Sequence, residues 1–203
     1  MGTGLLITFE GIDACGKTTQ IEILTKKLEG EHDYVVVREP GGTPIGEKIR
    51  QILLDNENIS MEGKTELLLY SASRYQLTKQ KLIPELEKGK IVICDRFYDS
   101  TTAYQGYGRG LDIDFIKSLN KFATDDLVPD LTFFLDISLE ERRRRIQGVA
   151  LDRLENEEHQ FHRNVRKGFL ELNKNNERFV KINGEESIKT ISKKIWDNIE
   201  RKL

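Results

Sequence analysis

Short apolar runs alternate with longer stretches in which apolar residues recur every three or four positions. The runs at residues 5–9, 34–39, 90–96 and 131–136 are nearly continuous in apolar side chains, and a weaker run follows at 178–183. Such runs are typical of strands that are buried on both faces of a sheet. Most of them end at glycine, proline or a charged residue, which predicts a turn or a loop directly after the strand.

The stretches between these runs have helical spacing. Ile21, Leu24 and Leu28, for example, predict one apolar helix face that ends at Gly30. Further helices are expected at residues 46–55, 66–80, 84–88, 112–124 and 139–146, in a long segment that ends near 174, and at 188–202. No helix is expected between Arg96 and Asp112. Alternating strands and helices predict an α/β fold, with a mostly parallel, doubly wound sheet and ligand sites at the carboxyl ends of the strands.

The composition mainly argues against certain classes of protein. The 203 residues contain no repeat and no linker rich in proline, glycine or serine, so we expect a single domain over residues 1–203. The net charge of −2 argues against a protein dedicated to binding nucleic acid or a membrane surface. Two cysteines without a CxxC pair, no signal peptide and no apolar run of membrane-spanning length favour a reduced, cytoplasmic protein.

One glycine-rich segment carries specific chemistry. It runs Gly11, Ile12, Asp13, Ala14, Cys15, Gly16, Lys17, Thr18, and it fits the G-x-x-x-x-G-K-[ST] phosphate-binding loop between a strand and a helix. Its backbone N–H groups, with Thr19 in the first helical turn, would surround the phosphates of ATP. Lys17 would reach the β- and γ-phosphates, and Thr18 would offer a hydroxyl to Mg²⁺.

A second pair of charged residues, Asp95 and Arg96, ends the apolar run IVICDR. The carboxylate of Asp95 is placed to hold Mg²⁺ beside Thr18, and Arg96 could neutralise charge that develops during phosphoryl transfer. No guanine-reading Asn-Lys-x-Asp motif is present, since NKFA at Asn120 lacks the aspartate, which argues against a Ras-like GTPase.

Together these motifs resemble the thymidylate kinase family. The segments that carry the resemblance are FEGIDACGKTTQ, REPGGTPIGEKIR, LLLYSASR, CDRFYDSTTAYQGYGRG and LDRLE, in family order over residues 5–155. The resemblance implies a nucleoside-monophosphate-kinase-like fold with a five-stranded parallel sheet and helices on both faces. It also implies a homodimer and transfer of the γ-phosphate of Mg²⁺·ATP onto dTMP, a step of dTTP synthesis.

The resemblance also assigns residues to the dTMP site. Asp13 would face the sugar, and Arg50 and Arg96 would clamp the 5′-phosphate, which suits the planar guanidinium fork. Tyr70 and Arg74 share one helix face and would contact the thymine ring and its edge. The residues matching the segment that lines the sugar and base are Thr101, Tyr104 and Gln105.

The run of arginines from 142 to 145 does not predict a nucleic-acid site, because successive helical residues point to different sides. Arg145 resembles the family arginine that lies against adenine. Residues 147–158 resemble a lid. Some relatives carry a catalytic arginine where this chain has Ala14, so we expect Arg153 of the lid to supply that cation.

Two other functions remain open at this point. The chain could be a related P-loop kinase with another nucleotide or nucleoside as acceptor, although a nucleoside kinase would have no acceptor phosphate for Arg50 to bind. It could also be a catalytically silent ATP-binding homologue, against which the intact Lys17, Thr18, Asp95 and Arg96 argue. His159 and His162 lack a third ligand nearby in sequence, so they predict no metal site.

Overall fold

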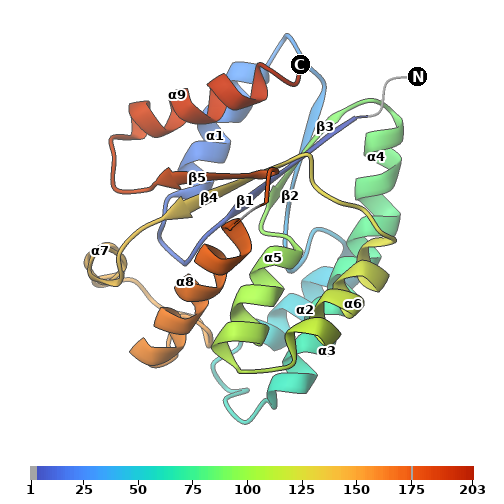
Figure 1. Cartoon of the computed structure of the whole chain (residues 1–203). Coiled ribbons are helices and arrows are strands. Elements are labelled where there is room, and N and C mark those ends of the chain that lie inside the picture. The colour runs from blue at the N-terminus through green and yellow to red at the C-terminus, as the bar shows by residue number, and fades with distance from the viewer. Residues whose placement is uncertain (1–3, 175) are drawn as a thin grey trace.

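The computed structural model describes residues 4–174 and 176–203, and its centre is a five-stranded parallel sheet with the strand order β2-β3-β1-β4-β5 (Figure 1). The strands are β1 (Leu5–Glu10), β2 (Tyr34–Arg38), β3 (Ile91–Asp95), β4 (Leu131–Asp136) and β5 (Phe179–Asn183). All six residues of β4 and the first four of β3 are buried. These central strands therefore have the two buried faces that their continuous apolar runs predict.

Helices cover both faces of this sheet, as the resemblance implies. Helices α1 (Lys17–Leu28) and α9 (Ile188–Ile199) pack together on one face, and α3 (Gly63–Leu77), α4 (Ile83–Glu87), α5 (Tyr98–Thr101), α6 (Ile113–Thr124) and α8 (His159–Asn173) lie on the other (Figure 1). Three of the longer helices begin at a side-chain cap: Asp112 accepts from the Phe115 N–H, Ser187 from Thr190, and Thr43 caps α2 (Pro44–Leu54).

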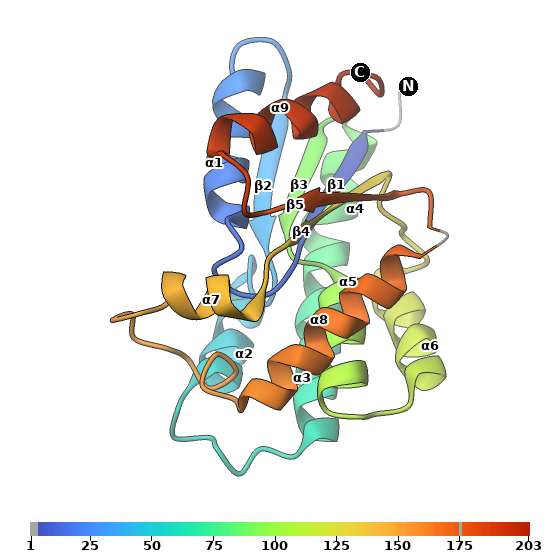
Figure 2. The same cartoon turned by 60° about the vertical axis from the view of Figure 1, so that its left-hand side comes forward.

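Two helices lie beyond the carboxyl ends of the strands. Helix α2 follows β2, and helix α7 (Leu139–Arg145) follows β4, with the loop after α7 extending past the sheet (Figure 2). Strand β1 lies between β3 and β4, so the loop after β1 begins where the connections diverge to the two sides. This is the position at which doubly wound sheets bind ligands.

The helix expected at 66–80 is longer than the pattern predicts. It begins at Gly63, passes through a π-helical segment at Thr78–Leu82 and continues as α4. Pro84 has no N–H to donate to the preceding turn, which accounts for an irregular hydrogen-bond pattern just before it.

A helical run at residues 98–108 was not expected. Helix α5 continues into a π-helical segment at Thr102–Gly108, where two glycines and neighbouring threonines disfavour a helix. Packing against α8 overrides that preference: a Cβ at Gly108 would lie 2.7 Å from the Phe161 ring, and one at Gly168 would lie 2.8 Å from Tyr107. These glycines let the two segments approach closely, and local sequence pattern does not reveal such a contact.

Within the described parts of the chain, no helix is both long enough and apolar enough to cross a membrane.

Candidate active site

The loop between β1 and α1 has the backbone of a phosphate cradle. Gly11 has φ +139°, and a Cβ there would lie 2.5 Å from the Leu135 carbonyl oxygen. Ala14 and Gly16 also have positive φ, and α1 begins directly after Gly16. Such a loop turns N–H groups inward at the positive end of a helix, which favours bound phosphate.

Three side chains of the phosphate and metal site meet beside this loop. The Lys17 ammonium group donates to the carbonyl oxygens of Gly11, at 3.4 Å, and Ile12, at 3.3 Å. The hydroxyl of Thr18 lies 3.5 Å from a carboxylate oxygen of Asp95. A hydroxyl and a carboxylate side by side are oxygen ligands that suit Mg²⁺, which usually keeps waters and phosphates as its remaining ligands. No group of three or more His, Cys, Asp or Glu side chains in the described residues forms a metal cluster.

A cavity of about 210 Å³ opens next to Lys17 and Asp95. It brings together side chains from five separated parts of the sequence. The lining residues are Asp13, Lys17, Arg38, Glu39, Pro40, Arg50, Leu54, Tyr70, Asp95, Arg96, Ser100, Thr101, Tyr104, Gln105, Asp152, Leu154 and Glu155. Three of these residues carry guanidinium groups, and Tyr70, Tyr104 and Gln105 add rings and an amide. This composition fits a ligand that has an anionic group and a flat polar ring.

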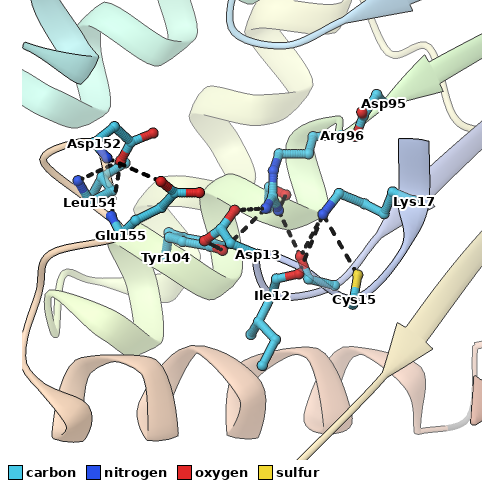
Figure 3. A network of polar contacts seen from close by, with 12 residues as sticks. Ile12, Asp13, Cys15, Lys17, Asp95, Arg96, Tyr104, Asp152, Leu154 and Glu155 are labelled. Carbon is cyan, nitrogen blue, oxygen red and sulfur yellow. Dashed lines mark hydrogen bonds and ion pairs between the residues drawn. The ribbon is translucent and has the colours of Figure 1, made fainter. Parts of the chain in front are cut away.

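Asp13, Arg96 and Tyr104 point toward one another in this cavity (Figure 3). Arg96 forms a short ion pair with one oxygen of Asp13, and the Tyr104 hydroxyl donates to the other at 2.9 Å. Burial alone would raise the pKa of Asp13, but Arg96, Lys17 and the Tyr104 hydroxyl together lower it well below its usual range. Asp13 is therefore an ionised acceptor, able to bind a sugar hydroxyl.

Arg96 itself has an unusual backbone, with φ +70°. Such a conformation costs about 1–3 kcal/mol in a non-glycine residue and persists only where the surroundings fix it. Glu10, fully buried at the end of β1, accepts from the Phe97 N–H at 2.8 Å and from the Ser100 hydroxyl. Ser100 in turn accepts from Arg96 at 3.0 Å. Sequence analysis missed Glu10, although an acid within the apolar run ITFEG was a visible signal.

Two further guanidinium groups, those of Arg38 and Arg50, line the same cavity. Arg50 is held by the Pro40 carbonyl oxygen at 3.0 Å, and Arg38 pairs with Glu47 at 2.9 Å. Burial, together with the charge of Arg38, lowers the pKa of Arg50. Two cations that disfavour each other in a partly buried site are stabilised by an anion between them. Arg38 was not predicted, because at the end of an expected strand it resembles an ordinary surface residue.

Arg74 lies elsewhere than expected. It is almost fully buried, and its guanidinium donates to Glu39 at 2.7 Å, to the Thr101 hydroxyl at 2.9 Å and to Asn120 at 3.2 Å. It does not line the cavity, whereas Tyr70, one helical turn earlier, does. The carboxylate of Glu39, which lines the cavity and which no sequence pattern pairs with Arg74, takes up the charge of Arg74, so Glu39 rather than Arg74 reaches the ligand side.

Arg153 also lies elsewhere than expected for a cation facing the γ-phosphate. Its side chain is 4% exposed, pairs with Glu66 at 2.7 Å and donates to the Leu53 carbonyl oxygen at 2.9 Å. In this arrangement it fixes the lid segment, residues 147–158, against α2 and α3. The lid residues that reach the cavity are Asp152, Leu154 and Glu155, which lie across from Asp13 and Tyr104 (Figure 3).

A different arginine of the 142–145 run brings charge toward the phosphate-binding loop. Arg142 is buried, donates to the Glu155 carbonyl oxygen at 3.0 Å and contributes to the lowered pKa of Asp13. Its Nε has no hydrogen-bond partner among the described residues. Arg142 was not predicted as a site residue, because a run of four arginines does not show which of them faces the loop.

Another cavity, of about 260 Å³, is lined in part by the same loop. It is lined by the loop, the first turn of α1, the end of α7 and residues after β5, namely Ala14, Cys15, Gly16, Thr19, Gln20, Arg145, Gly184, Glu186, Ile188 and Ile191. Arg145 donates to the Ala14 carbonyl oxygen at 3.1 Å and to that of Gly184 at 2.9 Å. The phosphate-binding loop therefore contributes residues to both cavities.

Comparisons with known proteins agree with this geometry. The family model described as thymidylate kinase matches residues 9–195. A thymidylate kinase of Caldanaerobacter subterraneus subsp. tengcongensis is 48% identical over 98% of this chain and 97% of its own length, and one of Halothermothrix orenii is 46% identical over 97% of each. The solved thymidylate kinase of Ehrlichia chaffeensis superposes with a TM-score of 0.79 at 35% identity, covering 98% of this chain and 99% of that chain. The chain belongs to the thymidylate kinase family.

Proposed function

We propose that this chain transfers the γ-phosphate of ATP to the 5′-phosphate of dTMP and releases dTDP and ADP. The observation that carries the proposal is the 210 Å³ cavity, whose lining combines the guanidinium groups of Arg38, Arg50 and Arg96 with the ring of Tyr70 and the amide of Gln105. The guanidinium groups suit a monophosphate, and a ring with an amide suits a base.

The transfer needs positioning and charge stabilisation more than it needs a base. An oxygen of the acceptor phosphate, already anionic, attacks the γ-phosphorus while the bond between that phosphorus and the β–γ bridging oxygen breaks. Lys17 and Arg96 lie beside the path and would stabilise the charge on the transferring group. Mg²⁺, held through Thr18 and Asp95, would neutralise phosphate charge when bound.

Some relatives carry a catalytic arginine where this chain has Ala14, so another residue of this chain has to supply that positive charge. Arg153 remains a candidate only if the lid opens and its pair with Glu66 breaks. Arg142 is already buried beside the lid and pairs with no carboxylate of residues 4–174 and 176–203, so we favour Arg142 as the additional positive charge near Asp13.

We also propose that the active form is a homodimer in the cytoplasm. Helices α3 and α6 expose Leu68, Tyr75, Phe115 and Phe122, and the rings of Tyr75 and Phe122 stack with centroids 6.0 Å apart. A second copy of this face would cover these side chains, and Phe122→Glu should then give a monomer in sedimentation. The cysteines Cys15 and Cys94 are both free, in keeping with a reducing compartment.

The decisive assay measures ADP formation from Mg²⁺·ATP with one acceptor at a time: dTMP, dUMP, dCMP, AMP, UMP or thymidine. Fast turnover with dTMP, slower turnover with dUMP and none with thymidine are expected. Faster turnover with another acceptor than with dTMP would identify that molecule as the substrate instead. Tight ATP binding without transfer to any of them would refute the proposal in favour of a silent homologue.

A further inference from the structure

Glu66 of α3 is a fully buried carboxylate whose two oxygens accept four hydrogen bonds. One oxygen accepts from the Gln105 amide at 2.9 Å and from Arg109 Nε at 3.1 Å. The other accepts from Arg109 Nη2 at 3.0 Å and from Arg153 Nη2 at 2.7 Å. The carboxylate therefore joins three segments: α3, the π-helical segment with Gln105, and the lid.

The charge of Glu66 determines which way the Gln105 amide faces. Burial alone would raise the pKa of Glu66, but hydrogen bonds from Arg109, Gln105 and Arg153 lower it, so the group is ionised. An ionised carboxylate only accepts hydrogen bonds, so the amide nitrogen of Gln105 must face it. The amide oxygen is then the polar atom that Gln105 can offer to a ligand in the cavity that it lines.

An amide oxygen in this place discriminates between pyrimidines. Thymine and uracil carry an N–H donor at ring position 3, whereas cytosine carries an unprotonated nitrogen there, which would face the oxygen as a second acceptor. A site built to pair with an N–H group rejects a ligand that lacks it, because the buried acceptor is left without a partner.

The same carboxylate holds the lid over the cavity. Arg153 is bonded to Glu66 and to the Leu53 carbonyl oxygen, while its neighbours Asp152 and Leu154 line the cavity. Arg109 adds a second link, since its Nη1 pairs with the lid residue Glu157 at 2.6 Å. Moving the lid away would remove the hydrogen bond from Arg153 to Glu66, and the loss of a partner by a buried charge is unfavourable in free energy.

Building on the proposed function, we propose that Glu66 is a positioning residue with two linked effects. It fixes Gln105 as a hydrogen-bond acceptor for the base, and it anchors the lid through Arg153. Base selection and lid closure are thereby coupled through one carboxylate that does not itself touch the substrate.

Glu66→Gln tests this coupling. A glutamine at 66 has one acceptor oxygen and one amide donor, so it cannot satisfy all four donors, and Gln105 becomes free to turn its amide. The ratio of kcat/KM for dTMP to that for dCMP should fall at least tenfold. Hydrogen–deuterium exchange of residues 147–158 should become faster, and ATP hydrolysis without an acceptor should rise as the lid loosens. Glu62→Gln, the same change on an exposed residue one turn earlier, should leave all three measurements unchanged.

Two further variants separate the linked effects and serve if Glu66→Gln is too unstable to assay. Gln105→Leu should lower the dTMP-to-dCMP ratio and leave lid exchange slow, whereas Arg153→Met should speed lid exchange and leave Glu66 bonded to Gln105. A folded Glu66→Gln protein with the wild-type ratio and a slow lid would overturn the proposal, as would an unchanged ratio in Gln105→Leu. A wild-type enzyme that is inactive with dTMP would instead refute the proposed function, while lid exchange would still report on Glu66.

Discussion

The arginines around the acceptor cavity fall into two groups that sequence alone does not separate. Arg50 and Arg96, the first group, line the cavity. Arg96 pairs with Asp13, which lines the cavity too, and among the described residues Arg50 donates to the backbone carbonyl oxygen of Pro40.

 In the second group, Arg74 and Arg153 are buried against the carboxylates of Glu39 and Glu66 and do not line the cavity. Arg96 is also paired with a carboxylate, but its side chain lines the cavity, so a ligand can contact it, whereas Arg74 and Arg153 do not reach the cavity surface.

The largest effect is expected from the first group. Arg96→Lys keeps the charge but loses the fork that reaches Asp13, the Gly11 carbonyl oxygen and Ser100 together. The value of kcat with dTMP should fall roughly 10²- to 10³-fold, while thermal stability changes little. Steady-state kinetics and thermal unfolding of the same samples check this. A loss confined to stability would place Arg96 in the second group.

Substitution of an arginine of the second group should mainly lower the stability of the protein. Arg74→Met leaves Glu39 buried without its partner, at a cost of about 3–5 kcal/mol in the free energy of unfolding. Arg50→Met removes one bond to a carbonyl and should cost about 1 kcal/mol, but it should raise the KM for dTMP. Urea unfolding of both variants provides the measurement. Equal stability losses would abolish the distinction between the two groups.

Two buried carboxylates extend the comparison to pH. Burial, with the nearby charge of Asp99, raises the pKa of Glu10 to about 8, whereas the arginines around Glu66 lower its pKa. Glu10 binds its proton more tightly in the folded state, so its contribution to stability is complete below pH 4.5 and is lost as the pH rises toward 8. The contribution of Glu66 has the opposite sign and is lost as the pH falls below the ordinary range of a glutamate.

Unfolding of the wild type and of Glu10→Gln should therefore be compared from pH 5 to 9. The stability of the wild type relative to the variant should decrease over this interval by a few kcal/mol. A difference that stays constant with pH would mean that Glu10 is ionised throughout, and that the account of its burial is wrong.

The sequence predicts best those parts of the molecule whose functional residues lie within one short segment of the chain. The strand, loop and helix around Lys17, and the strand that ends at Asp95 and Arg96, each fit within one short segment, so residue types and spacing suffice. The mostly parallel sheet predicted from the apolar runs is confirmed, because such runs report burial directly, and so is the five-stranded sheet with helices on both faces that the resemblance implies.

The wall of the cavity was predicted less well. Glu66 and Arg153 are 87 residues apart, and Glu39 and Arg74 are 35 apart, so no local pattern pairs them. The helical run at 98–108 depends on glycines that allow contact with α8, while the same glycines locally disfavour a helix. Tertiary contacts decide these features, and the roles of Arg74 and Arg153 depend on them.

The most direct test of the central claim is calorimetric binding of dTMP and thymidine to the wild type, Arg50→Met and Arg74→Met. The account predicts that the wild type binds dTMP about 100-fold more tightly than thymidine, because charge-assisted hydrogen bonds to the phosphate contribute roughly 3 kcal/mol. Arg50→Met should lose much of that preference, and folded Arg74→Met should keep it. Equal binding of thymidine and dTMP by the wild type, or a preference lost in Arg74→Met and kept in Arg50→Met, would contradict it.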